Sequence, residues 1–208
     1  MPRTSDARDR IVSVAARLFL ERSYHDVGVE ELCAAADVRK GSFYHYFSSK
    51  ADLAKAVIDL HMQAFLARLT SEPGATPAEL LLAIPDAISA IQTALHGQFG
   101  RFVGCPFGNM AAELATTDEA VRIHLAARLA ALEEHLAATC REAAAHNMLR
   151  NGVDPDRLAH ALFAHYQGLI LLAKLHGSSA NALAPALHDF LDGYLADPHR
   201  RTMPSRTS

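Results

Sequence analysis

Residues 38–53, VRKGSFYHYFSSKADL, concentrate side chains that can bind phosphate and read nucleic-acid bases. Ser42, Tyr44, His45 and Tyr46 fall on a segment too short to bury four polar or aromatic groups. Hydroxyls and imidazoles donate to phosphate oxygens and base edges, and tyrosine rings pack against sugars. This spacing therefore favours a surface that contacts nucleic acid.

A predicted helix start follows directly. Ser49, with Asp52 three residues later, matches a capping box and places Lys50 in the first helical turn. Backbone N–H groups at a helix start, together with a lysine, form an anion site. We therefore expect Lys50 to bind phosphate.

These side chains need short helices to position them. Apolar spacing predicts a helix over residues 6–22, and residues 29–36 are expected to form a short helix with Leu32 and Ala36 facing inward. A further short helix is expected over residues 39–47.

The segment KGSFYHYFSSKADL resembles the recognition-helix signature of the TetR family of transcriptional repressors. The resemblance implies that the helices over 6–22, 29–36 and 39–47 form a three-helix DNA-binding domain, in which the second and third make a helix-turn-helix and the third enters the major groove. It also implies a homodimer bound to a palindromic operator in double-stranded DNA. Lys40, Gly41 and Ser42 would lie near base edges, while Tyr44, His45 and Lys50 would hold phosphates. The complete predicted DNA-binding set is Arg39, Lys40, Gly41, Ser42, Tyr44, His45, Tyr46 and Lys50.

The chain departs from the family pattern at several positions. Gly28 stands where Thr or Ser commonly caps the second helix, and Asp37 stands where the turn commonly has Gly. Asp is one of the few residues that tolerate the left-handed conformation. Arg39 replaces a common Ser. Glu30 takes a position that is often basic, where it could accept from a cytosine amino group or repel phosphates.

Charge limits how the chain can bind DNA. The net charge is −3, and residues 1–60 carry nine Lys/Arg against nine Asp/Glu. Strong non-specific binding is therefore not expected, and individually placed groups must make the phosphate contacts.

The remaining sequence predicts an all-α fold without a sheet. Helices are expected over residues 50–69, 76–98, 116–146, 155–176 and 181–196, with the pattern broken at SEPGATP. The predicted organisation is a helix-turn-helix DNA-binding domain (1–48), a ligand-binding and dimerisation domain (49–198) and a flexible tail (199–208). Helices 155–176 and 181–196 are apolar on more than one side, so they are expected to form the homodimer interface.

A mostly apolar pocket is expected in the larger domain. Phe163, Tyr166, Ile170 and Lys174 recur at steps of three or four and share one helix face. Such a pocket suits a small apolar or electrophilic effector. The predicted ligand-binding residues are His61, Met62, Phe65, Phe102, Cys105, Phe107, Met110, Phe163, Tyr166, Gln167, Ile170 and Lys174.

The motif GCPFGNMAAEL at 104–114 resembles that of a TetR subgroup that includes N-ethylmaleimide-reductase repressors, some of which sense electrophiles through a cysteine. Pro106 suits the first helical position, which makes Cys105 the N-cap and favours its thiolate. The resemblance pairs Cys105 with Lys174. Alternatively, Cys105 is a small apolar packing residue and the effector binds reversibly.

Other classes of function have less support. The twelve histidines lack the spacing of a metal site, and no cofactor is expected. A cysteine-dependent enzyme would need Cys105 beside His and Asp, yet no P-loop, Rossmann fingerprint or nucleophile elbow occurs. A helical adaptor without DNA contact is a third class. Three widely spaced cysteines, with no secretory signal or apolar run of about 20 residues, favour the cytoplasm and no membrane partner.

Overall fold

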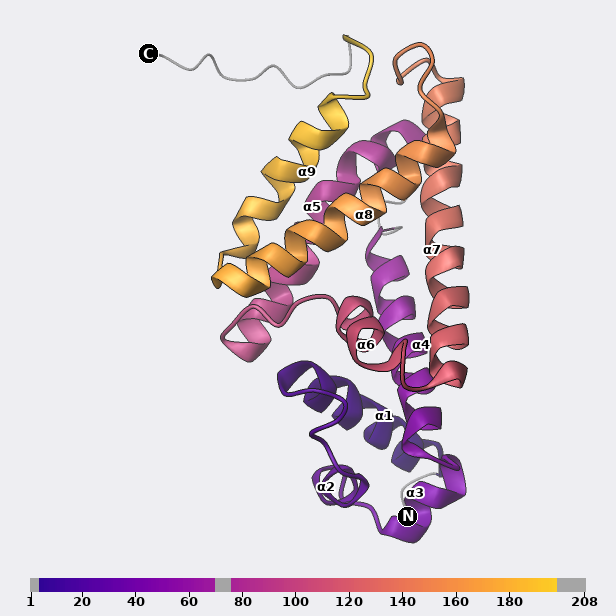
Figure 1. Cartoon of the computed structure of the whole chain (residues 1–208), viewed down its shortest axis with the longest axis vertical. Helices are drawn as coiled ribbons and strands as arrows, with labels where there is room; N and C mark the ends of the chain where they lie inside the picture. Colours follow the sequence, from indigo (N-terminus) through magenta and orange to yellow (C-terminus); the bar gives the residue numbers. More distant parts are fainter. Residues whose placement is uncertain (1–3, 70–75, 198–208) are drawn as a thin grey trace. The chain divides into compact units, whose positions relative to one another are not determined.

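The computed structural model describes residues 4–69 and 76–197, and this part of the chain is built from helices (Figure 1). In these residues no strand forms, and Leu149 and Leu195 make an isolated antiparallel β-bridge. The predicted all-α fold is confirmed. The tail 199–208 and residues 71–75 of the predicted break lie outside the described residues.

The observed helices follow the predicted ones closely. Their bounds are α1 Thr4–Glu21, α2 Val29–Ala35, α3 Lys40–Tyr46, α4 Lys50–Leu69, α5 Pro77–Phe99, α6 Pro106–Leu114, α7 Glu119–Ala145, α8 Pro155–His176 and α9 Leu183–Asp192, with a 3-10 turn at Ala180–Ala182 before α9.

The last predicted helix, 181–196, is too long at both ends. Pro185 has no N–H to donate, so its place in the first turn of a helix that begins at Leu183 costs no intrahelical hydrogen bond. Beyond Asp192 the backbone leaves the helix, and the Ala196 N–H donates to the Met148 carbonyl at 2.7 Å. That contact joins segments far apart in sequence, which local periodicity cannot predict.

The chain divides into two compact units that differ from the predicted boundary at residue 48. One contains Met1–Ala67 with Leu95–Ala131, and the other contains Arg68–Ala94 with Leu132–Ser208. Helices α4 and α6 and the beginning of α7 therefore belong with α1–α3. The 1–48 and 49–198 division stays a prediction about sequence domains.

The core of the first unit fixes the helix-turn-helix. Ile11 and Ala15 of α1, Leu32 of α2, Phe43 of α3 and Leu53 of α4 are completely buried. Burying an apolar side chain of Leu or Phe size contributes about 1.5–3 kcal/mol, so these contacts determine how α2 and α3 lie on α1. The polar residues of α3 are left on the outside.

In the second unit, α8 and α9 pack side by side. Asp154 caps the start of α8, where its carboxylate accepts from the Asp156 and Arg157 N–H groups, and Gly177, with φ 62°, caps its end. A capping box precedes helix α5: the Glu79 carboxylate accepts from the Thr76 N–H at 2.7 Å. Its Asp86 carboxylate lies 3.2 Å from the imidazole of His188 on α9.

By length and composition alone, Glu79–Phe99 of α5 and Pro155–His176 of α8 could cross a membrane. This is weak evidence, because core helices of soluble proteins meet the same criterion.

Candidate nucleic-acid interface

Helix α3 has a buried aromatic residue on one side and exposed polar residues on the other. Phe43 is completely buried and contacts Phe47 with ring centroids 5.7 Å apart. Tyr44 is 52% exposed although it is a large aromatic residue. Exposed side chains also include Arg39, Lys40 and His45, and Ser42 and Tyr46 are half-buried. The predicted DNA-facing residues of α3 therefore lie on one short, accessible element.

Gly41 has no packing role within the described residues. A Cβ added at this position would meet no heavy atom within 4 Å. Glycine in a helix costs about 1 kcal/mol relative to alanine, and at Gly41 the missing side chain leaves room for a close approach from outside the chain. DNA is the candidate that fits the neighbouring side chains.

The turn before α3 has the predicted geometry. Gly28 is the N-cap of α2, with extended backbone, and Asp37 has φ 51° in the left-handed region. The Val38 N–H donates to the Cys33 carbonyl at 2.9 Å, which closes the end of α2. The tolerance of Asp for this conformation explains how the chain forms the turn without glycine.

Lys40 and Glu30 form an exposed ion pair, with Nζ and Oε1 2.9 Å apart. A hydrogen bond from Lys40 holds the pKa of the Glu30 carboxyl below its ordinary value, and the same bond raises the pKa of Lys40. The pair keeps both groups ionised, and their opposite charges offset each other at residues that were expected near base edges. DNA must therefore compete with Glu30 for Lys40.

Lys50 does not extend from α4 as an isolated phosphate ligand. Its Nζ donates to the carbonyls of Tyr24 at 2.8 Å and Val27 at 3.0 Å, and lies 4.1 Å from the Tyr24 ring centroid. Burial lowers its pKa, which the charges of Glu113 and Asp26 partly oppose. Ser49 caps α4 as predicted, since its Oγ accepts from the Asp52 N–H at 3.1 Å. The ammonium, however, is directed at the turn between α1 and α2.

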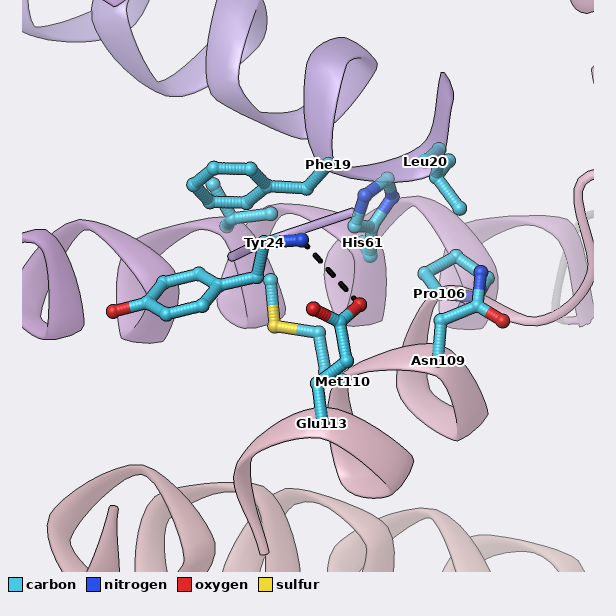
Figure 2. Close-up of a pocket in the computed structure, with 9 residues that line it drawn as sticks. Phe19, Leu20, Tyr24, His61, Pro106, Asn109, Met110 and Glu113 are labelled. Carbon is cyan, nitrogen blue, oxygen red and sulfur yellow. Dashed lines mark hydrogen bonds between the residues drawn. The ribbon is translucent and has the colours of Figure 1, made fainter. Parts of the chain in front are cut away.

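The predicted ligand residues of the first unit are mostly buried. Phe65 and Phe107 meet edge to face with centroids 6.2 Å apart. His61 and Met110 line a small pocket that also involves α1 (Figure 2). Burial lowers the pKa of His61 to about 4, although a hydrogen bond with the Ala16 backbone opposes this shift. The buried members here are Met62, Phe65, Phe102, Cys105, Phe107 and Met110.

The remaining predicted ligand residues belong to α8. Tyr166 and Ile170 are buried, Phe163 and Gln167 are half-buried, and Lys174 is exposed. Phe163 and Tyr166 pack together with ring centroids 6.4 Å apart. Their role in ligand binding stays a prediction.

Cys105 is the N-cap of α6, with Pro106 in the first turn, as predicted. It is only 3% exposed, whereas redox-sensing cysteines are commonly accessible. Burial raises the pKa of the Cys33 thiol and raises that of Cys140 to about 11, which makes both weak nucleophiles at neutral pH. Special reactivity of Cys105 stays a prediction.

Sequence reasoning missed Glu113 on α6. Its carboxylate accepts from the N–H groups of Tyr24 and His25 at 3.3 and 3.2 Å, and its Oε2 lies 3.1 Å from the His25 ring (Figure 2 draws the Tyr24 contact). These partners are almost ninety residues apart in sequence, and no motif marks either one. Across the described ranges, no cluster of three or more His, Cys, Asp or Glu could hold a metal ion.

A helix-turn-helix with an exposed polar recognition face, followed by a larger helical region, defines a class of bacterial DNA-binding regulators. Residues 11–57 match the family "Bacterial regulatory proteins, tetR family", and residues 77–188 match "Tetracyclin repressor-like, C-terminal domain". The chain belongs to the TetR family of transcriptional regulators. It is therefore a regulator of transcription and not an enzyme.

Individual proteins that resemble this chain are also regulators of transcription. The transcriptional regulator AcuR of Cereibacter sphaeroides is 34% identical over 177 residues, covering 84% of this chain and 79% of AcuR. The repressor NemR of Escherichia coli K12 is 30% identical over 189 residues, covering 86% and 91%. The crystal structure of E. coli NemR in reduced form matches with a TM-score of 0.79 at 26% identity, covering 93% and 98%. The similarity to NemR fits the subgroup that the GC motif indicated.

Proposed function

We propose that this chain is a repressor that binds a palindromic operator as a homodimer and releases it in response to a small effector. The observation that carries the DNA-binding part is the exposed polar face of α3, held on the buried Phe43. TetR regulators bind DNA and act as dimers, which supports the proposal. The proposed DNA contacts are Arg39, Lys40, Gly41, Ser42, Tyr44, His45 and Tyr46, and Lys50 acts mainly by supporting them.

Fluorescence anisotropy with the DNA upstream of the chain's own gene tests operator binding. Wild-type protein is expected to bind this DNA at least a thousandfold tighter than a scrambled duplex at physiological salt. Lys40→Ala should reduce the ratio between specific and non-specific affinity. Arg122→Ala on α7 is the matched control, since it removes an exposed arginine that pairs with Glu119. Equal affinity of the wild type for both duplexes contradicts the proposal.

The proposed dimer interface includes an exposed apolar stripe on α8. Leu171, Leu172 and Leu175 are 66%, 52% and 74% exposed. Ala164 and Gly168 are also exposed and continue the same face at helical spacing. A second copy packing its own α8 and α9 against this stripe would form a four-helix bundle. The predicted interface over 155–176 and 181–196 is therefore refined to this stripe and its neighbours on α9.

The proposed effector is a small apolar or electrophilic molecule. Two routes to DNA release remain as alternatives: covalent modification or oxidation of Cys105, and reversible binding. Similarity to NemR, whose structure is described as a reduced form, supports the first. The 3% exposure of Cys105 favours the second.

Cys105→Ser separates these routes. Under the thiol route, the variant binds operator normally but no longer releases it when treated with a quinone. Under the reversible route, wild type and variant respond alike. A cytoplasmic location, where thiols stay reduced, is part of the same proposal.

A further inference from the structure

Glu113 connects α6 to the turn that leads into the helix-turn-helix. This turn, residues 22–28, lies between α1 and α2, and Glu113 is the next-to-last residue of α6. Its carboxylate is the acceptor for two consecutive backbone N–H groups, those of Tyr24 and His25. Figure 2 shows Glu113 reaching from α6 toward Tyr24. Hydrogen bonds to a charged group contribute more to stability than hydrogen bonds between neutral groups.

Lys50 holds the same turn from its carbonyl side. Its ammonium donates to the Tyr24 and Val27 carbonyls. Lys50 is the first residue of α4, four residues beyond the end of α3. The turn therefore has a carboxylate on its N–H groups and an ammonium on its carbonyls, and the two charges lie close enough for Glu113 to raise the pKa of Lys50 against the effect of burial.

The side chains around the turn fix the position of Tyr24 and leave the turn as the partner of Glu113. Tyr24 is 8% exposed and packs edge to face on Phe19, with ring centroids 5.2 Å apart. His61, beside Glu113 in the pocket, is uncharged at neutral pH because its pKa is about 4. It therefore does not compete with the turn for the Glu113 carboxylate. A shift of α6 along its axis would pull on Tyr24 and His25 directly.

We infer that Glu113 is a positioning residue that couples α6 to the recognition helix, holding the turn at Tyr24 and His25 in the arrangement that binds operator. The family's C-terminal region includes α6, while its N-terminal region includes Tyr24, His25 and Lys50. The inference rests on the proposed function, because a repressor binds operator without effector and the ligand-free arrangement is then the binding one.

The test compares Glu113→Gln with Glu119→Gln in the full-length chain. The glutamine amide introduced by E113Q offers one acceptor and turns its NH₂ group toward the second backbone N–H. Glu119 begins α7, where its exposed carboxylate pairs with Arg122, so the control removes the same charge away from the turn. His25→Ala keeps both backbone bonds and removes the contacts of the ring with Glu113 and Tyr24.

Three quantities are measured for each variant: affinity for operator DNA, affinity for scrambled DNA, and amide hydrogen exchange at each residue. E113Q is expected to bind operator about tenfold more weakly, equivalent to about 1.4 kcal/mol. Affinity for scrambled DNA should stay within about twofold, and exchange should accelerate at Tyr24 and His25 specifically. H25A should lose less than about threefold, and E119Q should match the wild type.

Two results overturn the inference. One is unchanged operator affinity in E113Q despite faster exchange at Tyr24 and His25. The other is acceleration spread over the whole unit with a loss of thermal stability, which indicates a structural role only. If the wild type itself binds no operator, the proposed function fails, and exchange at Tyr24 and His25 still decides whether Glu113 holds the turn.

Discussion

At the scale of single residues, Gly41 affects both the stability of helix α3 and the space that is open to DNA. It lies in the first turn of the recognition helix α3, and no described heavy atom would contact an added Cβ. The protein therefore keeps a residue that weakens its own helix. The compensation we expect is room for the DNA backbone or a base edge.

Gly41→Ala should make the protein more stable and a poorer DNA binder. The expected gain in unfolding free energy is about 0.5–1 kcal/mol, because alanine loses less backbone entropy than glycine. Operator affinity should fall about tenfold if the methyl group meets DNA. Chemical denaturation and anisotropy measure the two effects. Gly97→Ala on α5, where an added Cβ also has open space, should stabilise the chain without changing DNA affinity.

His61 makes folding sensitive to acid. Its pKa is about 4 in the folded chain, below the ordinary 6.5, because burial disfavours the charged ring. Between these values the unfolded chain binds more protons, so stability is complete above pH 6.5 and falls as the pH drops toward 4. The loss due to His61 is roughly 3 kcal/mol at most.

His61→Gln should flatten the stability profile between pH 4 and 6.5, since glutamine does not titrate. Urea denaturation at several pH values measures this, and the difference from the wild type isolates His61 from other groups. His176→Gln, at an exposed position on α8, should leave the profile unchanged. If the profiles of the wild type and H61Q run parallel, His61 is not buried uncharged as described.

At the scale of elements, the start of α4 determines how the helix-turn-helix is closed. Ser49 caps the helix, and Lys50 ties it back to the turn after α1. The sequence predicted an anion site here, because a lysine beside the N–H groups of a helix start binds anions when no other part of the chain contacts it. The fold instead directs the ammonium to two carbonyls more than twenty residues earlier.

Lys50→Met should therefore act on stability more than on phosphate binding. Methionine keeps much of the apolar stem but loses two charge-assisted hydrogen bonds and the contact with the Tyr24 ring, at a cost of about 2 kcal/mol. The slope of operator affinity against salt should stay nearly unchanged. A slope reduced by about one unit, with no change in unfolding free energy, would instead restore Lys50 as a phosphate ligand.

Local signals in the sequence predicted most elements and failed where distant contacts decide. The cap at Thr76, the left-handed Asp37 and Cys105 before Pro106 are each recognisable from a few neighbouring residues. The end of α9 and the partners of Glu113 and Lys50 depend on segments remote in sequence. No spacing rule encodes those contacts.

At the scale of the whole molecule, the family resemblance predicted the fold class and the DNA-binding face, because α3 and its turn form one continuous segment. The candidate effector residues come from several distant helices. Periodicity identified which of them share a helix face, such as Phe163, Tyr166 and Ile170, and it carries no information about which faces meet. Those residues therefore stay predictions.

The exposed stripe on α8 leads to the last prediction, which concerns assembly. A monomer would leave a large apolar surface of α8 in contact with water at Leu171, Leu172 and Leu175. The proposed homodimer would bury this surface. Placing a charge there forces either separation of the subunits or burial of an unpaired carboxylate, which costs several kcal/mol. Leu172→Glu is therefore expected to yield a folded monomer.

Analytical ultracentrifugation and circular dichroism test this variant together. The wild type should sediment as a dimer, while L172E should sediment as a monomer with unchanged helix content. Its operator affinity should fall at least a hundredfold, because one subunit contacts only one half-site. Ile123→Glu on α7 is the matched control, since Ile123 is 55% exposed but lies outside the stripe, and it should remain dimeric. A dimeric L172E with wild-type operator affinity would exclude the α8 stripe as the interface and direct the search to another apolar surface, with Ile123 as the first candidate.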